Sequence, residues 1–71
     1  MTRLKFARID RGLSQASLAF AARIHQPDLS QIERGRLIPS QEQLERLAVA
    51  LDLRPCEVLQ EVSDAIVERA R

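Results

Sequence analysis

The sequence predicts an all-α protein, on three observations. Apolar residues recur at spacings of three and four, and Val, Ile and Thr never alternate in the period-2 runs typical of strands. The two Gly and three Pro fall between these periodic segments, where helices begin or end. Hydrophobic residues make up 45% of the 71 positions, which is too many for a disordered chain. We therefore expect one compact bundle of five helices that spans residues 1–71.

The first two helices are expected over residues 2–11 and 15–22. Gly12 follows the first segment and is typical of a helix stop. Ser14 precedes the second segment and is a favoured N-cap residue, because its hydroxyl can accept a hydrogen bond from a free backbone N–H. The inward-facing residues of these two helices are Leu4, Ala7, Leu18, Ala19 and Ala22.

The third helix is expected to begin near Gln26 or Pro27, after a very short break at residues 23–24, and to end before Gly35. Proline is tolerated in the first turn of a helix, since the N–H groups there have no helical partner. Two short helices joined by so short a break are typical of a helix-turn-helix. The inward positions of this unit are Leu18, Ala19, Ile24, Leu29 and Ile32.

The fourth helix is expected to begin after Ser40, with Gln43 completing a capping box, and to end at a turn over residues 52–54. Pro55 is expected to open a long fifth helix that reaches Ala70, with the C-terminal extension over about residues 58–71 helical. The apolar positions of these two helices are Leu44, Leu47, Ala48, Leu51, Val58, Leu59, Val62 and Ile66.

The composition excludes several classes of protein. Cys56 and His25 are the only cysteine and histidine, which leaves no disulfide framework and no cysteine or histidine cluster for a metal. There is no apolar run near 18 residues, and charges interrupt the N-terminal segment as they do not in a signal peptide. We expect a cytoplasmic protein that is not an enzyme, with no metal, cofactor, small-molecule ligand or membrane partner. Cys56 itself is expected to be a half-buried apolar residue, with a redox-sensing thiol as the alternative.

Three stretches resemble the phage-repressor-like, or Xre/Cro-type, helix-turn-helix proteins: LKFARIDRGLSQASLA, SQIERG and IPSQEQLERLAVALDL. The resemblance covers about residues 4–59. It implies a five-helix bundle of bacterial or phage origin that binds operator DNA, usually as a dimer, and regulates transcription at the nucleoid. Two positions depart from the family pattern: Arg23 stands where the turn usually has glycine, and Ser17 stands where the second helix often has glutamate.

The resemblance also implies a set of DNA contacts. The residues expected at base edges are Gln26, Pro27, Ser30 and Gln31, and those expected at phosphates are Gln15, Arg23, His25, Arg34 and Arg36. Glutamine can form two hydrogen bonds with adenine in the major groove, and a proline ring can contact a thymine methyl group. The alternative is that these side chains are merely solvated.

Two further roles are expected. In the family, the third helix is the recognition helix, which enters the DNA groove. Arg8 and Glu33 match family positions that often form an ion pair between the first helix and the end of this recognition helix. The apolar stripe of the last helix is long for one small core, so Val62 and Ile66 are expected at a two-fold dimer interface. Such a dimer would place two recognition helices one DNA turn apart on a roughly palindromic site.

The net charge of +1 conceals two opposed halves. Residues 1–36 hold seven basic and three acidic residues, which gives a net charge of +4. Residues 37–71 hold four basic and seven acidic residues, which gives a net charge of −3. The basic half contains the helix-turn-helix, so the positive side of the molecule could face the phosphates of DNA. Together with this charge distribution, the resemblance implies a sequence-specific regulator of double-stranded DNA, a repressor or autoregulator. The alternative is an antitoxin or adaptor that binds other proteins. The sequence leaves open a phage regulator, a restriction–modification controller or an antitoxin.

Overall fold

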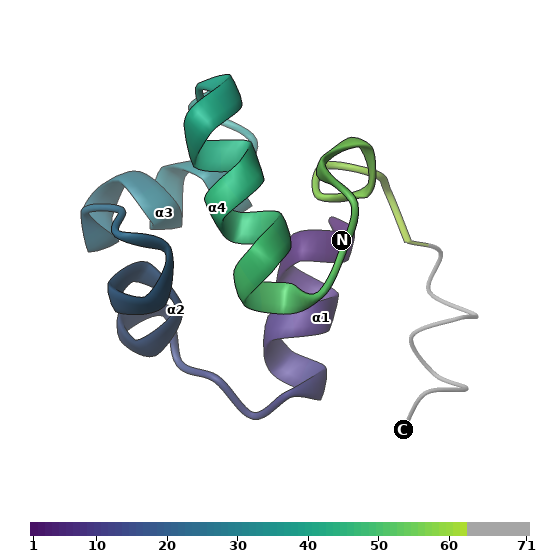
Figure 1. Ribbon diagram of the computed structural model, residues 1–71, viewed down its shortest axis with the longest axis horizontal. Coiled ribbons are helices and arrows are strands. Elements are labelled where there is room, and N and C mark those ends of the chain that lie inside the picture. Colours follow the sequence, from purple (N-terminus) through teal and green to yellow (C-terminus); the bar gives the residue numbers. More distant parts are fainter. Residues whose placement is uncertain (63–71) are drawn as a thin grey trace.

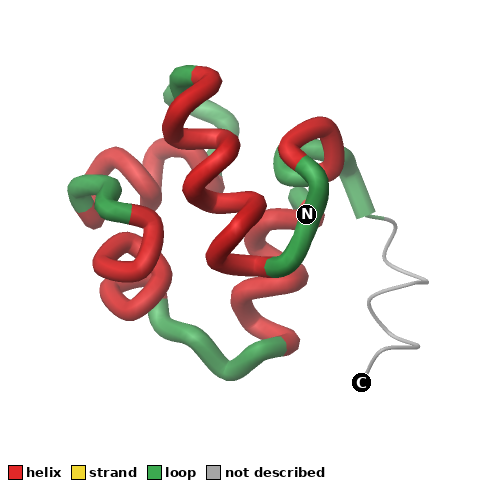
Figure 2. Tube along the Cα trace, in the orientation of Figure 1, coloured by secondary structure: helices red, strands yellow, loops and turns green. Residues whose placement is uncertain are grey.

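The structure is a computed structural model that describes residues 1–62. Four α-helices make up most of it (Figure 1), and short turns join them (Figure 2). In Figure 1, α4 crosses the middle of the bundle, α2 and α3 lie on its left, and α1 and residues 55–62 lie on its right. The elements are α1 (Arg3–Asp10), α2 (Gln15–Ala22), α3 (Gln26–Glu33), α4 (Gln41–Leu51) and the single 3₁₀ turn η1 (Pro55–Glu57).

Three of the helices begin at a hydroxyl cap. The side chains of Thr2, Ser14 and Ser40 accept hydrogen bonds from the backbone N–H groups at the third position of α1, α2 and α4. At α4 the cap is reciprocal, because the Gln43 side chain also accepts from the Ser40 N–H at 2.9 Å. These caps satisfy donors that have no partner inside a helix. The predicted caps at Ser14 and Ser40, and the predicted capping box, are therefore confirmed.

Left-handed residues other than glycine end two of the helices. Arg23 after α2 has φ 57° and ψ 45°, and Asp52 after α4 has φ 55° and ψ 45°. An L side chain in this conformation brings its Cβ close to the next carbonyl oxygen, which costs about 1–2 kcal/mol. The chain therefore turns sharply at Arg23, in the break between α2 and α3, although no glycine stands there.

The core lies where the four helices meet. Each contributes small or aliphatic side chains, and small residues on α2 allow α3 and α4 to approach it closely. Ile24, in the turn, is 6% exposed and fills the space between α2 and α3. The buried apolar residues are Leu4, Ala7, Leu18, Ala19, Ala22, Ile24, Leu29, Ile32, Leu47, Ala48, Leu51, Val58 and Val62.

The predicted long fifth helix is wrong within the described residues. Only residues 55–57 form a helical turn, and residues 58–62 run alongside the N-terminus instead. The backbone N–H groups of Arg3 and Leu4 donate to the carbonyl oxygens of Gln60 and Val58 at 2.7 and 2.9 Å, and the Val62 N–H donates to the Met1 carbonyl oxygen at 2.8 Å. Residues 63–71, where the rest of that helix was predicted, lie outside the described part of the chain.

The first turn of α1 explains this change of conformation. Its N–H groups have no helical acceptor, and the carbonyl groups of Val58 and Gln60, in the segment that follows η1, supply one. Val58 and Val62 are both buried in this arrangement, so the observed path buries two of the apolar residues whose spacing predicted a helix. Cys56, predicted to be half-buried, is exposed because the η1 turn directs it away from the core.

Candidate nucleic-acid interface

The predicted base-contacting residues lie on the outer side of α3. Gln26 and Pro27 are exposed at its start, and Ser30 and Gln31 are partly buried one turn later. Leu29 and Ile32 on the opposite side are in the core (0% and 1% exposed), which determines the side that α3 can present to a partner. This side carries amide, hydroxyl and proline ring groups, which are types of group that read base edges.

The start of α3 is open to solvent. His25 is its N-cap residue, and its side chain makes no capping hydrogen bond. Arg23 and His25 are both exposed in the turn before the helix. N–H groups at a helix start attract anions, and an exposed arginine beside them adds positive charge. The turn therefore places two of the predicted phosphate contacts next to the exposed residues of α3.

The end of α3 places two more arginines on the surface. Gly35 has φ 76°, and the Arg36 N–H donates to the Gln31 carbonyl oxygen at 2.9 Å, which ends the helix. Arg34 and Arg36 are exposed on either side of this glycine. Arginines thus flank α3 on both sides, and the helix between them carries polar side chains together with the acidic Asp28 and Glu33.

A buried ion pair joins α3 to α1. Arg8 Nε donates to Glu33 Oε2 at 2.7 Å and Arg8 Nη2 donates to Glu33 Oε1 at 3.1 Å. The two side chains are 12% and 2% exposed. Arg8 Nη1 also donates to the carbonyl oxygen of Leu13, between α1 and α2, at 2.8 Å. One guanidinium thus connects three parts of the chain, and the planar, two-pronged geometry restricts rotation of the end of α3.

Gln15, the first residue of α2, belongs to the same network. Its Nε2 donates to Glu33 Oε1 at 3.2 Å. An amide nitrogen carries two hydrogens, so one remains for a phosphate oxygen. The sequence predicted separate roles for Gln15 and Glu33, since no local pattern relates residues 18 positions apart.

A contact that the sequence did not predict lies between α4 and the end of α2. Arg46 Nε donates to the Ala22 carbonyl oxygen at 2.7 Å, and its Nη1 is paired with Glu42. Nothing in the spacing of Arg46 distinguishes it from a solvated helix residue, so the sequence holds no signal for this bond.

Of the two residues predicted at a dimer interface, Val62 and Ile66, the structure describes only Val62. Val62 is 3% exposed within a single chain. Ile66 lies outside the described residues. Exposed large apolar side chains occur elsewhere, and among residues 1–62 the three most exposed are Phe20, Ile38 and Val49 (88%, 87% and 84%).

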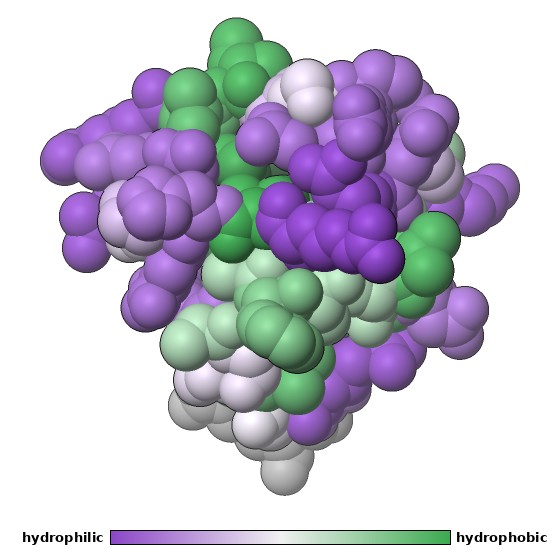
Figure 3. All heavy atoms as spheres, turned by 60° about the vertical axis from the view of Figure 1, so that its left-hand side comes forward, coloured by the Kyte–Doolittle hydropathy of each residue, from purple (hydrophilic) through white to green (hydrophobic). Residues whose placement is uncertain are grey.

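The surface on the α2 and α3 side is mixed in character. Figure 3 brings this side forward and shows hydrophilic surface toward both upper edges, with an apolar area below it. Within the described residues, no group of three or more His, Cys, Asp or Glu side chains is arranged to hold a metal ion. None of the described helices has the length and apolar character needed to cross a bilayer.

A helix that is fixed in orientation, polar on its outer side, flanked by exposed arginines and preceded by a sharp turn from α2 defines a helix-turn-helix DNA-binding domain. Comparison with known proteins supports this class, because the family model described as helix-turn-helix matches residues 4–58. The chain belongs to the Xre-like helix-turn-helix family, whose members are DNA-binding transcription regulators and generally not enzymes.

One solved structure with similarity to this chain is the restriction-modification controller protein C.AhdI from Aeromonas hydrophila. The two are 38% identical, with a TM-score of 0.73, and the match covers 78% of this chain and 83% of that one. A comparison with curated proteins gave no match.

Proposed function

We propose that this protein is a sequence-specific transcription regulator that binds a roughly palindromic operator as a homodimer and has no enzymatic activity. The observation that carries the proposal is the outer side of α3. Its polar residues are aligned along one helix, and the ion pair between Arg8 and Glu33 ties the end of that helix to α1. A module that binds only proteins has no need to hold groups of this kind in one orientation.

The proposal divides the contacts by chemistry. Gln26, Pro27, Ser30 and Gln31 read base edges, which provides sequence preference. Arg23, His25, Arg34, Arg36 and Gln15 contact phosphates, which provides affinity and register but no sequence information. The phosphate contacts release counterions, so affinity is expected to fall steeply as salt rises.

The similarity to C.AhdI favours a regulator of the controller type over a phage repressor or an antitoxin. In that role the protein would act in the cytoplasm of a bacterium, on DNA. In the proposed homodimer, Ile66 contributes to the two-fold contact between the subunits. Val62 is buried within its own chain, so its part in a dimer would be to support the segment that leads to Ile66.

The test is selection of bound sites from random DNA duplexes at low salt, followed by sequencing. A two-fold symmetric motif supports dimeric operator binding, and a single half-site supports binding by a monomer. Folded protein that enriches no sequence contradicts the proposal. In that case the exposed Phe20 and Val49 would favour the alternative, a module that binds another protein.

A further inference from the structure

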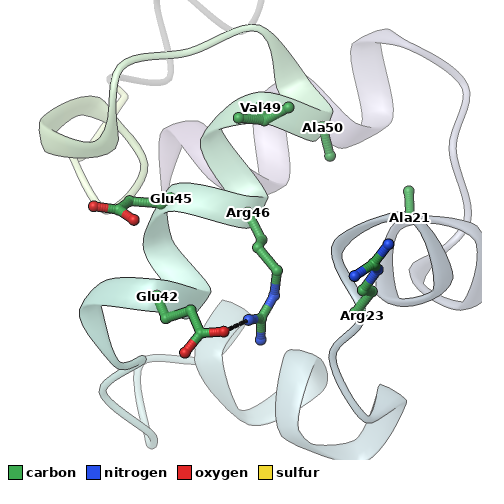
Figure 4. Close-up of a pocket in the computed structure, with 7 residues that line it drawn as sticks. All are labelled: Ala21, Arg23, Glu42, Glu45, Arg46, Val49 and Ala50. Carbon is green, nitrogen blue, oxygen red and sulfur yellow. Dashed lines mark hydrogen bonds and ion pairs between the residues drawn. The ribbon is translucent and has the colours of Figure 1, made fainter.

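The C-terminal end of α2 is held by a side chain from α4. Figure 4 shows Arg46 reaching from α4 toward the end of α2, where Arg23 lies, with Glu42 paired to the guanidinium. The bond from Arg46 Nε ends on the carbonyl oxygen of Ala22, the last residue of α2. Among residues 1–62, it is the one side-chain hydrogen bond that links α4 to the helix-turn-helix.

The Ala22 carbonyl needs a partner from outside its own helix, as do the other carbonyls in the last turn. The N–H groups that come after it are directed backward: Arg23 donates to the carbonyl oxygen of Phe20 at 3.2 Å and Ile24 donates to that of Ala19 at 2.9 Å. Arg46 supplies the hydrogen bond that Ala22 receives. Its positive charge also lies at the negative end of the α2 dipole, where a cation is stabilising.

The same place carries backbone strain. Arg23 is left-handed, with φ 57° and ψ 45°, although it is not glycine. A non-glycine residue stays in that conformation only where its surroundings restrict the alternatives. Ile24 restricts the turn from inside the core, and Arg46 restricts it from the side of α4.

We propose that Arg46 is a positioning residue for DNA recognition: by holding the Ala22 carbonyl it keeps the strained turn at Arg23 in place, and so fixes the angle between α2 and the recognition helix α3. This inference rests on the proposed DNA-binding function. It assigns a role in recognition to a residue of α4, which lies outside the helix-turn-helix.

The first test is a double-mutant cycle on the DNA site that the wild-type protein selects. Arg46→Met keeps the aliphatic stem and removes the guanidinium, and we expect about tenfold weaker binding. Arg54→Met is the matched control, because it removes the same charge from an exposed arginine that pairs with Glu57. We expect the control to bind within about threefold of wild type. All affinities are measured at a temperature where circular dichroism shows every variant folded.

The second half of the cycle repeats Arg46→Met in a protein that carries Arg23→Gly. Glycine adopts the left-handed conformation without a Cβ clash, so the turn no longer depends on Arg46. The further loss caused by Arg46→Met should shrink to about threefold or less. An equal loss in both backgrounds would mean that Arg46 acts through its charge alone and would overturn the proposal.

Two conservative variants separate the Ala22 bond from the Glu42 pair. Arg46→Lys retains a donor that can reach the carbonyl, and it should recover most of the lost affinity. Glu42→Gln removes the acidic partner and leaves the Ala22 bond in place, so it should bind within about threefold of wild type. If Glu42→Gln instead matched Arg46→Met, the ion pair would be the important contact and the proposal would be wrong.

A measurement without DNA distinguishes failure of this inference from failure of the proposed function. Amide hydrogen exchange at Ile24 should become about tenfold faster in Arg46→Met, while exchange at Leu44, in the first turn of α4, should not change. If the wild type selects no DNA, the proposed function fails and exchange at Ile24 still tests the anchoring of the turn. Unchanged exchange at Ile24 overturns the inference and leaves the function standing.

Discussion

Glu33, the last residue of the recognition helix, binds Arg8 of the first helix through two hydrogen bonds, of 2.7 and 3.1 Å. The carboxylate side chain is 2% exposed, and it also accepts a hydrogen bond from Gln15 at the start of α2. A single buried carboxylate therefore receives hydrogen bonds from both helices that precede the recognition helix.

Glu33→Ala should strongly destabilise the fold. It leaves the Arg8 guanidinium buried without its partner, and removal of one member of a buried pair costs about 3–5 kcal/mol. In a domain of this size, such a loss lowers the melting temperature by about 10 °C or more. Thermal unfolding followed by circular dichroism measures it. The double variant Arg8→Met/Glu33→Leu should be less destabilised, because no charge is left unpaired; an unchanged melting temperature for Glu33→Ala would contradict a structural role.

Gln26→Ala should change specificity more than general affinity. Loss of a two-pronged contact to a base removes about 1–3 kcal/mol of discrimination, so one position of the selected motif should become degenerate. The measurement is site selection with the variant beside the wild type. Gln60→Ala, at an exposed glutamine far along the chain, is the control and should leave the motif as it is.

Arg36→Ala should weaken binding to all sequences by a similar factor. Because a phosphate contact carries no sequence information, the selected motif should stay the same, and the slope of log affinity against log salt should become shallower by about 1. Titrations at several salt concentrations measure this. If the motif itself changed at one position, Arg36 would be reading a base.

Val62→Ala should destabilise the single chain. The side chain is 3% exposed, so its loss removes buried apolar contacts worth about 2 kcal/mol. Melting curves recorded over a range of protein concentrations distinguish the two roles of this residue. A loss that is the same at every concentration supports burial within the chain, whereas a loss confined to high concentration supports a direct place at the dimer contact.

Helix-capping residues allowed several helix boundaries to be predicted from the sequence. Ser14 and Ser40 begin their helices as predicted, and Arg23 turns the chain between α2 and α3 where the break was expected. These are local effects, set by hydrogen bonds and steric contacts within a few residues. The pairing of Arg8 with Glu33 was expected only from the resemblance to the family, since no local rule relates residues 25 positions apart.

The amino-acid sequence by itself determined the helical class, the positions of α2 to α4 and that of α1 to within one residue at each end, because hydrophobic periodicity and capping act over short distances. It also determined the helix-turn-helix and the inward residues of its core. Tertiary structure decided the conformation of the chain beyond Pro55, where the free N–H groups of α1 bind the carbonyl oxygens of residues 58 and 60, and a turn followed by an isolated bridge to Thr2 replaces the predicted helix. It also decided that Gln15 binds Glu33 and that Arg46 holds the end of α2. Each of these hydrogen bonds forms only where two helices pack against each other, and local sequence patterns do not predict which residues such packing brings together.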